Sequence, residues 1–296
     1  MKVRRTALAV LLIAALLHAG PMNATEAGSA TTAQAAPAVD VTGDGRADMV
    51  IREAGRLYVY PHNGSTTANP WTTRYDTGTT GWDTARVLLL ADATGDGRPD
   101  IITIRTDQTL WVYPHNGSSG TAANWGTPYA TGLTGWDIAD WIGVGDLTGD
   151  GRPDLVARHR ADGSLWVYPH NGSGGTSASW AGLYSVGVNW NGATALLLGD
   201  VTGDGRTDLV ARDAAGNLVI HATGSGAQIS GGSGWNLAGV LLLQDVTGDG
   251  RPEITIRDSA GAAWVYRHNG SATSNPWTQT RYAGGTGWNI ASAMLL

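Results

Sequence analysis

The sequence of 296 residues contains no cysteine, no phenylalanine and a single lysine, and only 15% of its residues are charged. The lack of cysteine excludes a disulfide-linked scaffold, a cysteine-ligated zinc site and a cysteine nucleophile. The low charge content, combined with 43 glycines, favours an all-β, turn-rich protein over a helical bundle. The net charge of -6 leaves no basic footprint of the kind that nucleic-acid-binding proteins carry. We therefore expect no nucleic-acid partner.

Residues 1–38 have the pattern of a secretory signal peptide followed by a short leader. Basic residues within the first five positions precede an apolar run from residue 7 to residue 17, and small residues follow it. A membrane span needs about 20 apolar residues, so a retained membrane anchor is the weaker alternative. We expect a secreted, extracellular protein without membrane insertion, whose folded part spans residues 39–296.

A nine-residue word, which we call the Asp word, occurs five times along the chain. It first reads DVTGDGRAD from Asp40 to Asp48, and it returns at spacings of 52, 54, 54 and 45 residues. After each Asp word come a short apolar strand, a polar turn, a second strand, a Gly/Ser/Thr loop, a strand with Trp or Tyr, and a Gly-Trp or Asn-Trp pair. A period of about 20 to 50 residues is typical of repeat architectures, and four short strands per unit predict the blade of a β-propeller.

The two ends of the chain predict how the propeller closes. Each internal Trp pair is followed by an apolar strand that leads into the next Asp word, but no such strand precedes Asp40 in the mature part of the chain. At the other end, Trp288 to Leu296 supply a strand with no Asp word after it. We therefore predict a five-bladed ring of four-stranded blades in which the C-terminal strand completes the first blade, which removes an exposed sheet edge. An open β-solenoid or a string of separate domains is the alternative.

Acidic residues at positions 1, 5 and 9 of each Asp word, with glycine at position 6, are typical of a loop that places oxygens around Ca²⁺. Position 3 is always Thr, and position 7 is always Arg, which can offer only its backbone carbonyl. No bidentate Glu follows at position 12, so the word is not an EF-hand. We expect about five structural Ca²⁺ ions; the alternative is a set of turns in which Asp-Gly supplies only turn chemistry. The fifth word ends in Glu, which leaves the occupancy of that loop open. The candidate metal ligands are Asp40, Thr42, Asp44, Arg46, Asp48, Asp92, Thr94, Asp96, Arg98, Asp100, Asp146, Thr148, Asp150, Arg152, Asp154, Asp200, Thr202, Asp204, Arg206, Asp208, Asp245, Thr247, Asp249, Arg251 and Glu253.

The Asp words and the apolar strands that follow them resemble the FG-GAP (VCBS-type) repeats of integrin α-subunit heads and of secreted bacterial proteins. The resemblance covers the whole mature chain and is most specific in the metal loop, because no literal Phe-Gly and Gly-Ala-Pro stretch is present. It implies structural Ca²⁺ at Asp40, Asp44, Asp48 and their counterparts. Integrin-like rings usually have seven blades, so five is a departure, in which the chain is similar to five-bladed propeller lectins.

Thirteen tryptophans in a chain without phenylalanine favour two uses of the indole ring, which are sugar stacking and packing between blades. Tryptophans within strands, such as Trp111, are predicted to be core residues. The Gly-Trp and Asn-Trp pairs enter the innermost strands, where an exposed Trp beside Asp or Asn could form one sugar site per blade; inter-blade packing is the alternative. These candidate ligand-binding residues are Trp82, Asp83, Trp136, Asp137, Trp190, Asn191, Trp235, Asn236, Trp288 and Asn289.

Four histidines, His62, His115, His170 and His268, each precede Asn-Gly-Ser. One histidine per blade spaces them too far apart to share a metal ion. We therefore expect each histidine to cap an Asn-Gly turn.

No catalytic motif emerges from the sequence. It has no Gly-x-Ser-x-Gly elbow, no phosphate-binding loop and no His-Glu-x-x-His. We expect a non-enzymatic, calcium-stabilised lectin that binds glycans or a cell-surface polysaccharide through repeated sites and gains avidity from the repetition. The alternative is a protein-binding adhesion, adaptor or targeting subunit of a larger secreted complex, for example a toxin-delivery assembly, and a polysaccharide-active enzyme is a third reading.

Overall fold

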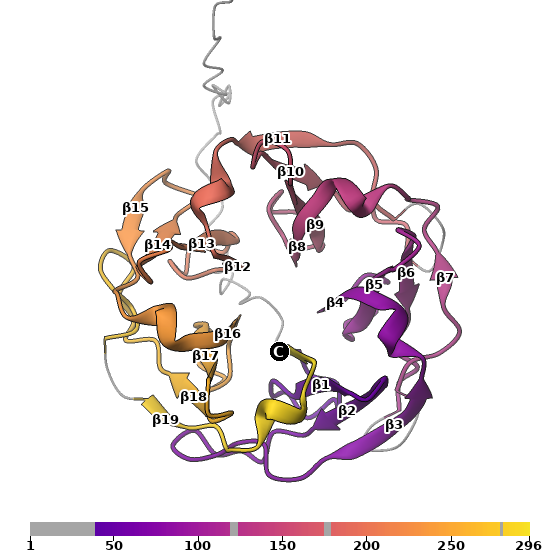
Figure 1. Cartoon of the computed structure of the whole chain (residues 1–296), viewed down its shortest axis with the longest axis horizontal. Helices are drawn as coiled ribbons and strands as arrows, with labels where there is room; N and C mark the ends of the chain where they lie inside the picture. Colours follow the sequence, from indigo (N-terminus) through magenta and orange to yellow (C-terminus); the bar gives the residue numbers. More distant parts are fainter. Residues whose placement is uncertain (1–38, 119–123, 175–178, 279–280) are drawn as a thin grey trace, which may run out of the picture. The chain divides into compact units, whose positions relative to one another are not determined.

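The computed structural model describes residues 39–118, 124–174, 179–278 and 281–296. The expected signal peptide and leader, residues 1–38, lie outside the described residues. Five antiparallel sheets of four strands follow one another around a ring (Figure 1). The predicted five-bladed propeller is therefore confirmed.

Each blade has four strands, which follow one another in chain order from the inner to the outer position, except that β20 is the inner strand of blade 1. Blade 1 contains β20 (Ala293–Leu295), β1 (Met49–Glu53), β2 (Arg56–Tyr60) and β3 (Tyr75–Thr80). Blade 2 contains β4 (Ala85–Ala91), β5 (Asp100–Arg105), β6 (Leu110–Tyr113) and β7 (Tyr129–Ala130). Blade 3 contains β8 (Ala139–Gly145), β9 (Asp154–His159), β10 (Leu165–Tyr168) and β11 (Tyr184–Gly187). Blade 4 contains β12 (Ala195–Gly199), β13 (Asp208–Arg212), β14 (Leu218–His221) and β15 (Gln228–Ser230). Blade 5 contains β16 (Ala238–Gln244), β17 (Glu253–Asp258), β18 (Ala263–Tyr266) and β19 (Arg281–Ala283).

A short 3-10 turn, which we call the corner, leads into the inner strand of each blade. The corners are η1 (Trp82–Thr84), η2 (Trp136–Ile138), η3 (Trp190–Gly192), η4 (Trp235–Leu237) and η5 (Trp288–Ile290). The residue before each Trp adopts a left-handed conformation, which is why it is Gly in four corners. Asn189, with φ of 68°, takes this place in the corner of blade 4 and explains the Asn-Trp pair of the sequence.

The hydrophobic core lies between adjacent blades. In β5, Ile101 packs with the apolar residues of blade 1, whereas Ile102 and Ile104 pack with those of blade 3. Successive side chains of a strand point to opposite faces, so a strand between two neighbouring blades is apolar on both. This packing explains the continuous apolar runs in the sequence.

The ring closes between the two ends of the described chain. Strand β20 pairs with β1 in an antiparallel register that places Val50 opposite Leu295 and Ile51 opposite Met294. Arg52 donates a hydrogen bond from Nε to Ser292 Oγ over 2.9 Å. The prediction that the C-terminal strand completes the first blade is therefore confirmed.

Candidate functional site at the blade interfaces

Each Asp word forms a tight loop that is held by its own carboxylates. Asp40, at position 1 of the first word, accepts hydrogen bonds from the backbone N–H groups of Gly43, Asp44 and Gly45 over 2.6 to 3.0 Å. Asp44, at position 5, accepts one from the N–H of Arg46 over 3.0 Å. The other four words repeat both arrangements. The first carboxylate therefore acts as an internal cap of its loop.

The acidic residue at position 9 is fully buried and joins two loops of one blade. Asp48 accepts hydrogen bonds from the N–H of Thr42, within its Asp word, and from the N–H of His62, at the end of β2. Desolvation by burial raises the pKa of Asp48 and Asp100 to about 6 and the pKa of Glu253 to about 7. Burial also raises the pKa of Asp154 and Asp208. Each of these carboxylates therefore carries a desolvation cost in its charged form.

The fit of Ca²⁺ to the Asp words depends on whether the acidic side chains of a word converge. In the described part of the chain, no group of three or more His, Asp or Glu side chains could hold a metal ion. The carboxylates at positions 1 and 9 instead point their oxygens at backbone N–H groups. As placed, the residues do not form the cage of six to eight oxygens that Ca²⁺ takes. Calcium binding by the 25 candidate ligands therefore stays a prediction.

The corner tryptophans pack between blades. Trp82, Trp136, Trp235 and Trp288 are 3 to 7% exposed, and Trp190 is half-buried. Their rings contact Tyr113, Tyr168, Tyr266, Tyr60 and, for Trp190, His221, with centroid distances of 4.7 to 5.0 Å. The interpretation that these indoles are exposed stacking platforms is thus wrong for the four buried ones, because a tyrosine ring and the core between two blades cover their faces. The accompanying residues, Asp83, Asp137, Asn191, Asn236 and Asn289, are exposed.

Four arginines clamp the corners from the preceding blade. Arg52 donates from Nη1 to the carbonyl oxygens of Trp82 and Ala85 over 3.0 and 2.7 Å. The same pair of bonds joins Arg158, Arg212 and Arg257 to the corners of the blades that follow. These arginines come four residues after the last acid of their Asp words. In blade 2 that position holds Ile104, and Arg86 of β4 bonds to Trp136 and Ala139 instead.

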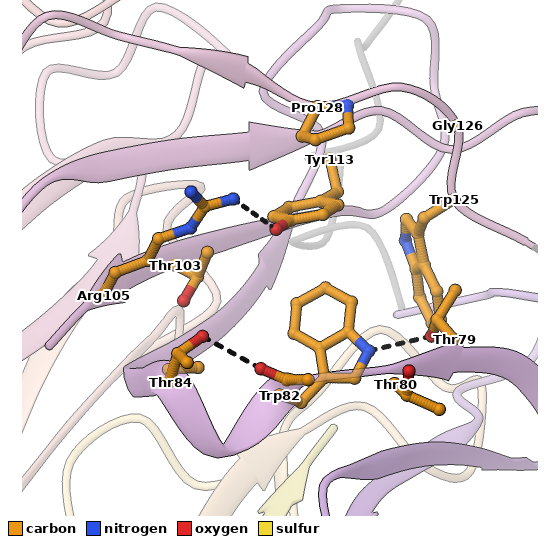
Figure 2. A pocket seen from close by; sticks show the side chains of 12 residues that line it. Thr79, Thr80, Trp82, Thr84, Thr103, Arg105, Tyr113, Trp125, Gly126 and Pro128 are labelled. Carbon is orange, nitrogen blue, oxygen red and sulfur yellow. Dashed lines mark hydrogen bonds between the residues drawn. The ribbon is translucent and has the colours of Figure 1, made fainter.

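A cavity of about 310 Å³ lies at the interface between blades 1 and 2. The corner around Trp82 forms one side of it, and Tyr113 and Trp125 of blade 2 form another (Figure 2). Arg105 reaches it from the end of β5 and donates a hydrogen bond to the Tyr113 hydroxyl over 2.7 Å. The lining residues are Thr79, Thr80, Gly81, Trp82, Thr84, Ala85, Thr103, Arg105, Tyr113, Trp125, Gly126 and Pro128.

Sequence reasoning found one residue of this cavity, Trp82, and missed the others. One feature of the sequence could have pointed to them, which is the position of the arginine that follows the second Asp word. Arg105 follows the last acid of that word by five residues rather than four, which turns its side chain to the opposite face of β5. The side chain therefore leaves the clamp position and points into the interface with blade 1.

The comparisons with known proteins agree with this architecture. A family model described as an FG-GAP-like repeat matches residues 40–103, 92–157 and 146–211. No match was found among curated proteins. Within the described residues, no helix is long and apolar enough to span a membrane.

Several solved structures are similar to the chain. One concerns the recognition of non-reducing terminal N-acetylglucosamine by a lectin of Agrocybe aegerita, with 27% identity, a TM-score of 0.48, and coverage of 79% of this chain and 63% of that chain. This chain therefore matches less than two thirds of the length of the lectin chain. A second concerns the de novo evolutionary emergence of a symmetrical protein, with 14% identity, a TM-score of 0.51, and coverage of 83% and 97%. A third is TcdB2-TccC3 without its hypervariable C-terminal region, with 14% identity, a TM-score of 0.36, and coverage of 78% and 12%.

Proposed function

We propose that this chain, which belongs to the FG-GAP-like repeat family, is a carbohydrate-binding propeller whose sugar site is the cavity between blades 1 and 2. The observation that carries the proposal is the composition of the cavity wall. The half-buried ring of Tyr113 supplies aromatic surface, and the buried Trp82 and Trp125 line the cavity beside it. Threonine hydroxyls and Arg105 supply hydrogen-bonding groups. Aromatic surface suits the apolar C–H faces of a sugar ring. A few placed polar groups then orient its hydroxyls.

The test compares two tyrosines that pack under corner tryptophans in the same way. Tyr113 lines the cavity, whereas Tyr266 occupies the equivalent place in blade 5, with ring distances of 4.7 and 4.9 Å to Trp82 and Trp235. A glycan array should identify a binding sugar; N-acetylglucosamine, which the Agrocybe aegerita lectin recognises, is included as a first probe. The Tyr113→Ala change should abolish binding of that sugar, whereas Tyr266→Ala should retain it. Equal binding by both variants would rule out this cavity.

A binding role is also supported by three acids without counterparts in most other repeats, Glu53, Asp76 and Asp140. Asp140 is paired with Arg158 at 2.7 Å. Glu53 forms an ion pair with Arg74, and Asp76 accepts from Arg56 at 2.6 Å. A glycosidase needs a pair of carboxyl groups that act as acid and as base or nucleophile, and these three are engaged by arginines. The proposal therefore includes no catalytic step. It further includes secretion of the mature chain, which mass spectrometry of the culture medium would test.

One surface favours protein binding as a second candidate function. Leu183, Tyr184, Val186 and Val188 lie on or beside β11, the outer strand of blade 3, and are 40 to 64% exposed. No charged residue occurs between Asp162 and Asp200, so this edge lacks the charges that usually protect an outer strand. The change Val186→Lys should abolish co-purification with a partner chain if the edge binds one, and it should leave glycan binding unaltered.

A further inference from the structure

Arg105 does not form the contact with the next blade that arginines form after the other Asp words. In those blades the guanidinium spans two corner carbonyls of the next blade, at 2.7 to 3.0 Å. In blade 2, Arg86 takes over both carbonyls. The guanidinium of Arg105 is therefore not needed to hold blade 2 against blade 3, and it lies on the wall of the cavity toward blade 1 (Figure 2).

The position of the Arg105 guanidinium is fixed by two aromatic residues. It stacks over the ring of Trp111, with 3.8 Å from Cζ to the ring centroid, and it donates to the hydroxyl of Tyr113 over 2.7 Å. Within the described residues, Arg105 forms no ion pair within 4.0 Å, although its charge contributes to lowering the pKa of Asp107 in the next turn. A fixed guanidinium loses little conformational entropy when it binds an anion.

Three other blade interfaces differ from this arrangement in the cation or in its surroundings. Between blades 5 and 1, Arg74 stacks over Tyr58 but is ion-paired with Glu53. Between blades 2 and 3, His159 stacks on Trp166. Between blades 4 and 5, Arg281 lies over Trp264 and donates to the hydroxyl of Tyr266, but its side chain is exposed, whereas that of Arg105 is half-buried on the cavity wall. At the interface of blades 1 and 2, the stacked guanidinium of Arg105 lines a cavity and, among the described residues, forms no ion pair within 4.0 Å.

We infer that the cavity binds a saccharide bearing a carboxylate, with Arg105 as the residue that selects it. The inference rests on the proposed function, since it names the class of sugar for that site. The planar guanidinium presents two parallel N–H groups, which match the two oxygens of a carboxylate. The aromatic wall contacts the sugar ring. The net charge of -6 means that the chain as a whole does not attract an anion, so the attraction has to come from Arg105.

The experiment uses sugars that differ only in the carboxylate. Methyl glucuronide and methyl galacturonide are titrated into the full-length mature protein beside methyl glucoside and methyl galactoside, with binding followed by calorimetry. We expect at least one acidic sugar to bind about tenfold or more tightly than its neutral counterpart, because a hydrogen bond to a charged group contributes about 1.5 to 3 kcal/mol. The preference should fall with added salt.

Two matched variants assign the preference to Arg105. The change Arg105→Gln should abolish the preference for the acidic sugar, whereas Arg281→Gln, which removes the same stacked cation from another blade, should retain it. Neutral sugars that bind as tightly as acidic ones, with Arg105→Gln unchanged, would overturn the inference and leave the proposed function standing. Glucose 6-sulfate binding more tightly than the glucuronide would overturn the choice of a carboxylate. If no sugar of either kind binds to the protein, the proposed function falls together with the inference.

Discussion

The Nε2 atom of His115 in blade 2 lies 3.0 Å from the carbonyl oxygen of Val41 in the Asp word of blade 1. The Nδ1 atom of the same ring accepts a hydrogen bond from the N–H of Gly117 over 3.1 Å. Since Nδ1 is an acceptor, Nε2 carries the proton and donates a hydrogen bond to the carbonyl oxygen of Val41. The predicted cap of the Asn-Gly turn is confirmed, and the same ring also joins two blades.

The same two bonds recur at other interfaces. His170 reaches the carbonyl of Ala93, and His268 reaches that of Val201. His62 caps its turn in the same way, but its Nε2 is buried without a described partner. Blade 4 has Thr223 in place of His. The histidine bridges therefore hold three of the five interfaces.

The first prediction concerns the pH dependence of stability. Desolvation by burial lowers the pKa of His115 below 6.5, and the same holds for His62, His170 and His268. A lowered pKa in the folded state means that the contribution to stability is complete above pH 6.5 and is lost as the pH falls below it. The change His115→Gln removes one such group. Its free energy of unfolding should be about 1 kcal/mol lower at pH 7.5 but should fall less steeply between pH 7.5 and 5.

Urea unfolding at several pH values measures this slope. The buried acids change the free energy of unfolding in the opposite direction. Their raised pKa values, about 6 for Asp48 and Asp100, mean that the folded state binds more protons than the unfolded state as the pH falls. Their contribution to stability therefore rises as the pH falls. The comparison of variant with wild type cancels their contribution. Parallel slopes for the two proteins would show that protonation of His115 is not coupled to folding.

The second prediction concerns the corner tryptophans. Trp136 is 4% exposed and packs 5.0 Å from the ring of Tyr168. The change Trp136→Ala should therefore open a void between blades 2 and 3 and lower the free energy of unfolding by about 3 to 5 kcal/mol. Thermal unfolding is the measurement. The control is Asp137→Ala, which removes an exposed side chain from the same corner and should change stability by less than about 0.5 kcal/mol.

The sequence predicts the number of blades because the Asp words can be counted. It predicts the closure of the ring because the inner strand that is absent before the first Asp word is present at the C-terminus. It does not predict where an indole points. The Gly-Trp pair looks the same whether Trp136 faces solvent or the core between blades 2 and 3. Its burial depends on residues such as Tyr168, 32 residues further along the chain. The cavity depends on a shift of one residue that moves Arg105 to the other face of β5. Such a shift is visible in the sequence, but its meaning depends on knowing which face meets blade 1.

The third prediction concerns the closure of the ring. Strand β20 supplies the inner strand of blade 1, and Met294 is buried in the core that blades 1 and 5 share. Deleting residues 291–296 should expose the inner edge of β1 and uncover this core, so we expect loss of the cooperative unfolding transition or a large fall in melting temperature. The control is Leu296→Ala alone, a residue after the last paired position, which should have a smaller effect. A deleted protein with a normal transition would contradict closure by this strand.

The last prediction concerns calcium, for which the Asp words supply the candidate ligands. If the loops bind Ca²⁺ with the weak affinity of extracellular modules, about 10⁻⁴ M, then 10 mM Ca²⁺ should stabilise the protein by up to about 2.7 kcal/mol per occupied site. The gain should disappear in EDTA, and it should shrink in Asp96→Asn, which weakens one word while leaving the buried Asp100 in place. Asp107→Asn is the matched control, because Asp107 lies in an exposed turn outside the words and accepts hydrogen bonds only from Thr109. If the melting temperature is the same in Ca²⁺ and EDTA, the words work as metal-free loops, in which the N–H groups that surround Asp92 and Asp100 neutralise the carboxylates without a cation. Asp92→Ala should then destabilise the protein equally in both buffers.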